Sequence, residues 1–163
     1  MIYVNSRAII ERFAPNGVEV VIQLRTKAGQ ICYEFPGGRI NPYESFFDAL
    51  RREVKEETGL DIINIKGKDN CIQTESNDIF EVECFQPYAV YQTLRGPVDS
   101  MGVYFRCNAE GELLIFGDGT KDIKWVSVEE LQYMLDTKNV FSDIDRAAAL
   151  FYLKDSKCGK NKY

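Results

Sequence analysis

Three glutamates, Glu53, Glu56 and Glu57, lie together in a segment whose residue pattern is that of a helix. Because an α-helix turns by about 100° per residue, Glu53 lies one turn from both other glutamates, and the three carboxylates share one side. Like charges at these spacings repel and would destabilise an isolated helix by about a few tenths of a kcal/mol per pair. The segment must therefore fold so that this side faces water or cations while another side is buried.

The buried side of this predicted helix consists of Phe47, Leu50 and Val54, which recur at the i, i+3, i+7 spacing of an apolar stripe. The helical pattern covers residues 44–58, and the glycine that follows it, Gly59, is a good C-terminal stop. The stripe points away from the glutamates. The sequence therefore predicts that it anchors the helix to a sheet.

The carboxylate oxygens of these glutamates suit a hard divalent cation. Mg²⁺ and Mn²⁺ prefer oxygen ligands, keep several waters and take phosphate oxygens of a substrate as further ligands. Arg52 lies i, i+4 from Glu56, and its planar guanidinium can hold a carboxylate in a fixed orientation. Before the helix, Gly37 and Gly38 let the backbone approach a ligand closely, so that a carbonyl there is available to complete a metal shell.

The chain of 163 residues contains no histidine, and its formal net charge is −5. The absence of histidine excludes Ser-His-Asp and Cys-His catalysis and histidine zinc sites. Acid–base chemistry must then fall to carboxylates, lysine, tyrosine, cysteine or metal-bound water. The negative charge argues against a nucleic-acid partner, since a protein that binds a phosphate backbone needs a basic face.

The spacing from Gly38 to Leu60 resembles the Nudix box, G-x5-E-x7-R-E-U-x-E-E-x-G-U, in which U is an aliphatic residue. Every defined position is filled, by Gly38, Glu44, Arg52, Glu53, Val54, Glu56, Glu57, Gly59 and Leu60. The flanks also resemble the family, in the Glu-Phe-Pro-Gly-Gly entry at residues 34–38 and the Trp-Val-Ser junction at residues 125–127. The chain is therefore identified as a member of the Nudix hydrolase family, with the subfamily unassigned.

The resemblance implies an α/β fold, the Nudix-type α/β/α sandwich with a mixed β-sheet. It also implies an activity, the hydrolysis of a pyrophosphate bond in a nucleoside diphosphate linked to another moiety (NDP-X). In that reaction a metal-activated water attacks phosphorus while Mg²⁺ or Mn²⁺ neutralises the developing charge. An alternative is a Nudix-fold module that binds or senses a nucleotide without catalysis.

The resemblance assigns roles by position. The implied metal ligands are Glu53, Glu56, Glu57 and the carbonyl of Gly37. In some members the residue that matches Glu53 also activates the water, whereas in others a carboxylate from a late loop does so. Arg52 would orient Glu53, and Gly38 and Glu44 would support the loop and helix of the site.

Outside the box, a second carboxylate is expected from residues 110–122, where the candidates are Glu110, Glu112, Asp118 and Asp122. Arg25 and Arg39 are candidates for phosphate contacts, with a solvated surface position as the alternative for each. The proline that ADP-ribose pyrophosphatases tend to carry about 15 residues after the box is missing, since the nearest is Pro87. The entry motif and small size resemble enzymes that cleanse oxidised nucleoside triphosphates, a feature shared by many subfamilies.

Strands and helices interleave along the chain, which favours one mixed sheet with helices on both faces. Strands are predicted at residues 8–13, 18–24, 33–35, 61–65, 101–107, 113–116 and 124–126, with one or two more within 72–94. Further helices are predicted at residues 127–135, behind a Ser127 cap, and at 143–153. Residues 1–153 form a single domain in this interpretation, and residues 154–163 form a charged, frayed tail.

The sequence also indicates where the protein acts. It has five cysteines and no C-x-x-C pair, no signal-peptide pattern, and no apolar run near the roughly 18 residues that span a bilayer. A cytoplasmic location without membrane contact is expected. The expected partner is a small-molecule nucleotide. Many members of the family are dimers, so a homodimer is one of the open alternatives for the oligomeric state.

Overall fold

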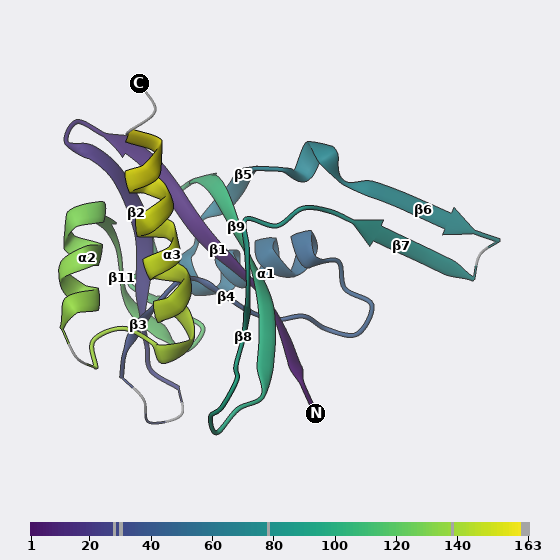
Figure 1. The fold of residues 1–163 in the computed structure, drawn as a ribbon, viewed down its shortest axis with the longest axis horizontal. Coiled ribbons are helices and arrows are strands. Elements are labelled where there is room, and N and C mark those ends of the chain that lie inside the picture. Colours follow the sequence, from purple (N-terminus) through teal and green to yellow (C-terminus); the bar gives the residue numbers. More distant parts are fainter. Residues whose placement is uncertain (28, 30, 78, 138, 161–163) are drawn as a thin grey trace.

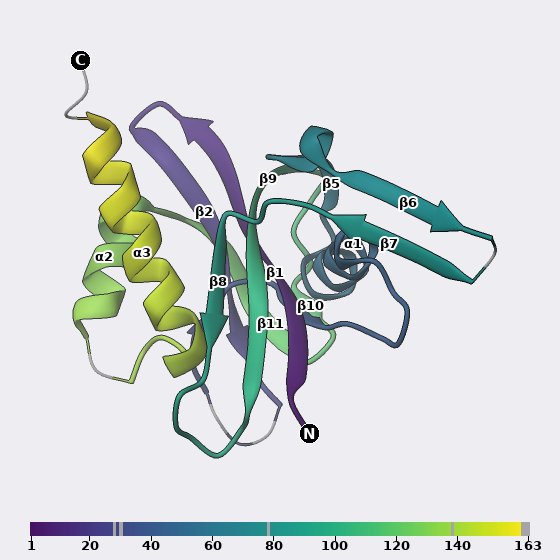
Figure 2. The ribbon, with the colours of Figure 1, turned by 45° about the vertical axis from the view of Figure 1, so that its right-hand side comes forward.

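A mixed β-sheet separates helix α1 (Phe46–Thr58) on one face from helices α2 (Val128–Asp136) and α3 (Asp143–Lys160) on the other (Figures 1 and 2). This arrangement comes from a computed structural model, which describes residues 1–27, 29, 31–77, 79–137 and 139–160. The predicted α/β/α sandwich with a mixed sheet is confirmed.

The main sheet has the strand order β10-β11-β2-β1-β9-β5, with β3 paired to β2, β4 to β1 and β8 to β9. Its strands are β1 (Tyr3–Ala14), β2 (Gly17–Arg25), β3 (Tyr33–Glu34), β4 (Gly37–Arg39), β5 (Asp61–Ile65), β8 (Ala89–Gln92), β9 (Ser100–Glu110), β10 (Phe116–Gly117) and β11 (Thr120–Ser127). The long β1–β9 pair is parallel, whereas β1–β2 is the predicted antiparallel hairpin, closed where Ala14 lies opposite Gly17.

Two apolar cores lie on the two faces of this sheet. Because successive side chains of a strand point to opposite faces, Ile9 of β1 packs toward α2 and α3 while Ala8 and Ile10 pack toward α1. The predicted apolar stripe of α1, which includes Leu50 and Val54, is fully buried against the sheet. The apolar stripe therefore fixes the rotation of the helix that carries the glutamates.

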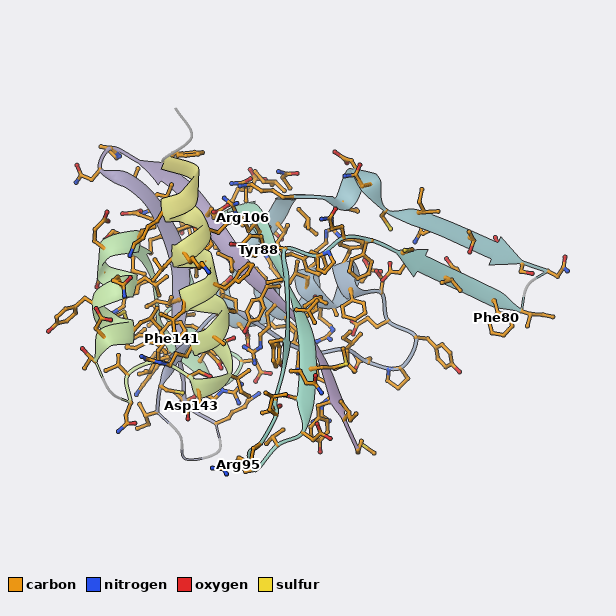
Figure 3. All side chains as sticks on the ribbon, viewed as in Figure 1. Phe80, Tyr88, Arg95, Arg106, Phe141 and Asp143 are labelled. Atoms are coloured by element: carbon orange, nitrogen blue, oxygen red, sulfur yellow. The ribbon has the colours of Figure 1, made fainter. Side chains whose placement is uncertain are left out.

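A two-stranded arm projects from the body of the molecule (Figures 1 and 2). It follows a short 3-10 turn, η1 (Lys68–Asn70), and consists of β6 (Ile72–Ser76) paired with β7 (Phe80–Cys84), so Phe80 lies near its far end (Figure 3). The Glu83 carboxylate ties the arm to the body, since it accepts hydrogen bonds from the Ser45 hydroxyl (3.0 Å) and the Phe46 amide (3.0 Å) at the start of α1.

Two strand predictions were wrong in detail. The strand predicted at residues 113–116 is reduced to β10, because the preceding turn packs on the end of α1 instead: Leu114 N–H donates to Thr58 O (2.9 Å), and the Leu114 side chain covers Gly59. The segment 72–94 holds three strands rather than one or two, since the arm and β8 each have their own pairing partner.

Helix α3 continues to Lys160, past the end predicted at Leu153. The added turns are supported by hydrogen bonds from the Tyr88 hydroxyl to Asp155 (3.0 Å) and from the Ser156 hydroxyl to Tyr152 O (2.8 Å). The division into a domain of residues 1–153 and a tail stays a prediction, and residues 161–163 lie outside the described residues. Within the described part of the chain, no helix combines the length and apolar character needed to cross a membrane.

A buried carboxylate, Glu11 of β1, binds the middle of α3 to the sheet. It accepts hydrogen bonds from Arg106 (2.8 Å), Lys66 (2.7 Å) and Tyr152 (2.7 Å). The Arg106 guanidinium also lies beside the ring of Tyr88, 5.4 Å from its centroid (Figure 3). Although burial alone would raise it, the hydrogen bonds from Arg106 and Lys66 hold the pKa of Glu11 below its usual value.

Replacing Glu11 with Gln is expected to lower the free energy of unfolding by about 2 kcal/mol near neutral pH, the scale of hydrogen bonds to a charged group. Because the pKa of Glu11 is lower in the folded state, its stabilisation is present above the pKa of the unfolded chain and is lost as pH falls through the folded value. Denaturant titrations of both proteins at a series of pH values from neutral to acid measure this. A difference between the two proteins that does not shrink toward acid pH would contradict the prediction.

Candidate active site

Helix α1 is positioned by its two ends. The Ser45 side chain accepts a hydrogen bond from the Phe47 amide at the start, and Gly59 adopts the left-handed conformation (φ 83°) at the end, where its amide bonds to Lys55 O. The buried stripe fixes the rotation of the helix, so its glutamate side faces strand β4 at Gly37 and Gly38. The capping residues and the apolar stripe, all within or next to α1, therefore set the position of the helix that carries the glutamates.

Glu57 is buried, with 9% of its surface exposed, and it turns inward. Its Oε2 accepts two hydrogen bonds, from the Gly37 amide (2.8 Å) and from Gln23 Nε2 (2.7 Å). Burial raises the pKa of Glu57 to about 8. In the described residues no lysine or arginine forms an ion pair with it, so the buried carboxylate has no balancing cation from the chain.

Glu53 is held by Arg52, whose Nη1 donates to Glu53 Oε1 (2.7 Å). The same guanidinium grips Glu44 with two further bonds, from Nε (2.7 Å) and Nη2 (2.8 Å), and reaches the carbonyl of Arg39 (3.1 Å). The Arg52 guanidinium holds the pKa of Glu44 below its usual range. Arg52 is thus oriented by Glu44 on one side and restrains Glu53 on the other.

Glycine is required at position 38 because the Glu53 carboxylate lies against the backbone there. A Cβ at Gly38 would come within 2.6 Å of the Glu53 carboxylate carbon. Glu56, the third glutamate, is about half exposed, and its carboxylate lies 3.6 Å from Arg52. The three side chains thus take three directions, toward Gln23, toward Arg52 and toward solvent.

In the residues that the structure describes, no three carboxylates or thiols are gathered in a geometry that would hold a metal ion. The donor set nevertheless fits a hard cation, since it consists of oxygen atoms alone. One further observation fits such a cation: burial raises the pKa of the Glu57 carboxyl, and a divalent ion at its oxygens would stabilise the ionised form. The buried Gln23 Oε1 has no hydrogen-bond partner among the described residues.

Two residues that sequence reasoning missed lie directly behind Glu57. Gln23 of β2 is fully buried, and its Nε2 also lies 3.4 Å from Glu34 Oε1. Glu34 of β3 is 2% exposed and accepts a hydrogen bond from Arg25 Nε (2.9 Å). The available signal was Gln23 itself, a polar residue inside the apolar run of residues 18–24.

A cavity of about 550 Å³ opens between the N-terminal end of α3 and the loop that joins β8 to β9, and the box glutamates are not among the residues that line it. Its volume is in the range typical of small-molecule sites. Arg25 is part of its wall, together with Tyr91, Arg95, Phe141 and Asp143. Figure 3 shows Arg95, Phe141 and Asp143 at the same end of the molecule.

A buried ion pair forms the base of this cavity and was not predicted. Arg7 lines the cavity, and its Nη1 donates to Asp145 of α3 (3.1 Å) and to Phe35 O (3.2 Å). Asp145 is fully buried and also accepts hydrogen bonds from the Tyr104 hydroxyl and the Phe35 amide (3.3 Å). Although burial opposes it, the carboxylates of Asp145 and Glu34 hold the pKa of Arg7 above its ordinary value.

Of the four candidate carboxylates within residues 110–122, Asp118 is joined to helix α1 by a backbone hydrogen bond. Its amide donates to Glu56 O (3.0 Å), whereas its side chain is exposed and paired with Lys27 (2.8 Å). Asp122 is turned toward the Tyr33 hydroxyl and Lys124 (3.2 Å), and the hydrogen bond from Tyr33 lowers its pKa.

The other two carboxylates are exposed near the end of β9. Glu110 lies across from Asp61, and the backbone carbonyl of Glu112 faces Gly59. Of the two predicted phosphate contacts, Arg25 faces the cavity, whereas the Arg39 guanidinium lies 3.7 Å from the ring centroid of Tyr3. The functional roles of these residues stay predictions.

Comparison with known proteins agrees with this picture. The model of the NUDIX domain family matches residues 3–145. A relative from Bacillus subtilis (strain 168), named "Putative 8-oxo-dGTP diphosphatase YtkD", is 36% identical over 74 residues, which are 40% of this chain and 46% of that protein. The match thus spans about half the length of this curated relative.

Solved structures share the fold. A NUDIX hydrolase from Nitrosomonas europaea has a TM-score of 0.70 at 15% identity, covering 97% of this chain and 73% of that one. The NUDIX domain of NrtR from Shewanella oneidensis, in complex with ADP ribose, has a TM-score of 0.64 at 14% identity, covering 97% of this chain and 89% of that one. At such identities the likeness concerns the fold alone.

Proposed function

The chain belongs to the NUDIX domain family, and on that basis we propose that it is a pyrophosphohydrolase that cleaves NDP-X substrates with Mg²⁺ or Mn²⁺. The observation that carries the proposal is Glu57, a buried carboxylate that forms no ion pair with a lysine or arginine of the described residues, on the same helix as the restrained Glu53. A surface helix whose glutamates were merely solvated would have no reason to bury one of them.

The residues proposed to hold the metal are Glu53, Glu56, Glu57 and the carbonyl of Gly37. A divalent cation at these oxygens neutralises charge on the pyrophosphate oxygens of the substrate. Glu53 is proposed to take the proton of the attacking water, because Arg52 holds only one of its oxygens by a hydrogen bond. Arg52 keeps that carboxylate in a fixed orientation.

The cavity between α3 and the β8–β9 loop is proposed to receive the nucleoside part of the substrate. Arg25 lines it and donates a hydrogen bond to Glu34, and its guanidinium suits a contact with phosphate. Phe141 and Tyr91 supply apolar surface for a ring. The name of the Bacillus relative favours nucleoside triphosphates, including oxidised ones, among the NDP-X compounds.

A panel of nucleotides tests the proposal. The purified protein, with Mg²⁺ or Mn²⁺, is incubated with canonical and oxidised nucleoside triphosphates, ADP-ribose, nucleotide sugars and dinucleoside polyphosphates, and released pyrophosphate or nucleoside monophosphate is measured. Cleavage of at least one class, dependent on the cation, is expected. Absence of turnover throughout the panel would refute the proposal.

The second candidate is a nucleotide-binding module without catalysis. It is favoured by one observation, that the carboxylates are not gathered into a metal-holding cluster in the described residues. The ADP ribose complex of the NrtR NUDIX domain shows that this fold can hold a nucleotide. Calorimetric binding of a nucleotide that the protein does not cleave in the presence of Mn²⁺ would favour this candidate.

Replacing Gly38 with Ala is expected to lower kcat by about a hundredfold, because the added Cβ would come within 2.6 Å of the Glu53 carboxylate and displace it. A misplacement of about 1 Å in a catalytic group can cost this much. The melting temperature should change little, since the far end of a flexible side chain gives way. Steady-state kinetics on a cleaved substrate, together with a thermal melt, checks both outcomes; an unaltered kcat would show that the position of Glu53 does not matter.

A further inference from the structure

Gln23 lies between two buried carboxylates, those of Glu57 and Glu34. Its Nε2 donates to Glu57 Oε2 at 2.7 Å and lies 3.4 Å from Glu34 Oε1. The residue is fully buried near the C-terminal end of β2, and Val20, Val21 and Ile22 before it are apolar core residues. An amide in that place needs a physical reason, since an apolar side chain of similar volume would fit the strand without buried polar atoms.

Only one of the two polar groups of the Gln23 amide has a hydrogen-bond partner among the described residues. The Nε2 group is used, but Oε1 is buried and has no partner among the described residues. Buried polar atoms without partners are rare in folded proteins, and an unmade bond of this kind often marks a place for a ligand, ion or water.

The contact on Glu57 has a directional consequence. Both donors, Gln23 Nε2 and the Gly37 amide, bind the same carboxylate oxygen, Oε2. The described residues make no hydrogen bond to the other oxygen, Oε1. Donors that fix one oxygen of a carboxylate are a common way in which proteins orient a metal ligand.

We propose that Gln23 is a positioning residue for divalent-cation binding, which holds the Glu57 carboxylate so that its free oxygen faces the cation. The inference rests on the proposed function insofar as Glu57 is a metal ligand. It adds a residue from β2 to a site whose motif runs from Gly38 of β4 through α1 to Leu60. Glu34, on the other side of Gln23, links the same amide to Arg25 at the cavity.

The test is the affinity of the metal-free protein for Mn²⁺, measured by titration calorimetry without nucleotide. The variant Gln23→Met removes both polar atoms at nearly constant volume and is expected to weaken Mn²⁺ binding by about 10- to 100-fold, the usual effect of losing such an orienting partner. The matched control is Gln73→Met, at an exposed position of the arm, which should bind Mn²⁺ like the wild type.

A second readout separates positioning from a loss of structure. For a substrate that the wild type cleaves, Gln23→Met should raise the Mn²⁺ concentration at half-maximal rate while leaving KM for the nucleotide at saturating Mn²⁺ within about twofold. An unaltered Mn²⁺ affinity in a folded Gln23→Met protein would overturn the inference. A variant with weaker Mn²⁺ binding, a higher KM for the nucleotide and a lower melting temperature would overturn it too, because these three changes together indicate a purely structural role.

The variant Gln23→Glu keeps the inference testable if Gln23→Met does not fold. It places a third carboxylate beside Glu34 and Glu57, so the metal-free protein should melt at a lower temperature and regain stability on adding Mn²⁺. A rise in melting temperature with Mn²⁺ no larger than that of the wild type would overturn the inference.

The two proposals fail in different ways. If the wild type binds Mn²⁺ and Gln23→Met does not, while no nucleotide is cleaved, the hydrolase proposal falls and the positioning role stands. If nucleotides are cleaved and Mn²⁺ affinity is unaffected by Gln23→Met, the hydrolase proposal stands and the positioning role of Gln23 falls. A wild type that binds no Mn²⁺ would overturn the positioning role, and the nucleotide panel would still decide hydrolysis.

Discussion

Replacing Glu53 with Gln is expected to lower kcat by about three orders of magnitude, within the range of about 10²- to 10⁴-fold for the loss of a general base. The substitution keeps the size of the side chain and an oxygen that can accept the bond from Arg52 Nη1. It removes the negative charge and the basicity of the carboxylate. Since the Arg52–Glu53 ion pair is partly exposed, the melting temperature should fall only slightly.

The measurement is steady-state kinetics at saturating Mn²⁺ on a nucleotide from the panel, beside a thermal melt of each protein. Glu129→Gln, at an exposed position in the first turn of α2, is the matched control and should behave like the wild type. A kcat for Glu53→Gln within about threefold of the wild type would refute the catalytic role of Glu53, because the loss of a general base lowers the rate by far more than that.

Replacing Asp145 with Ala is expected to lower the free energy of unfolding by about 3–5 kcal/mol, the cost of removing one partner from a buried ion pair. The change leaves Arg7 buried with Glu34 at 3.8 Å as its remaining carboxylate. It also takes an acceptor from Tyr104 and from the Phe35 amide. The loss of stability is large because the Arg7 guanidinium, the Tyr104 hydroxyl and the Phe35 amide are all shielded from water.

Chemical denaturation at constant temperature measures this loss. Asp143→Ala, an exposed carboxylate two residues earlier in the same helix, is the matched control and should change stability by no more than about 0.5 kcal/mol. An Asp145→Ala protein as stable as that control would show that the ion pair contributes nothing net. Because Asp145 lies under the cavity, the folded fraction of the variant should also bind nucleotide more weakly.

The arrangement of α1 shows what local pattern can predict. Its stripe of Phe47, Leu50 and Val54 is buried as expected, and Gly59 ends the helix in the left-handed conformation. Both features depend on residues within one or two turns of each other, so helical periodicity and capping rules are sufficient. The sandwich fold could also be predicted, from the alternation of strand and helix patterns and from the family motif.

The turn at residues 113–115 shows where local pattern fails. Its apolar residues favour a strand by propensity, but Leu114 packs over Gly59 and hydrogen bonds to Thr58 instead. The competing contact comes from a helix that ends more than fifty residues earlier in the chain. Propensity cannot weigh such a contact, because it contains no information on which distant surface is available.

By itself, then, the sequence determined that three carboxylates share one side of a helix, that Arg52 and two glycines stand beside them, and that the apolar stripe lies on another side. Only the tertiary structure decided that Glu57 turns inward to Gln23 while Glu53 turns to Arg52. It also decided that the cavity rests on a pair, Arg7 and Asp145, separated by 138 residues. The reason is physical: the helix geometry follows from bonds within a few residues, whereas the direction of each buried polar side chain follows from which distant donor reaches it.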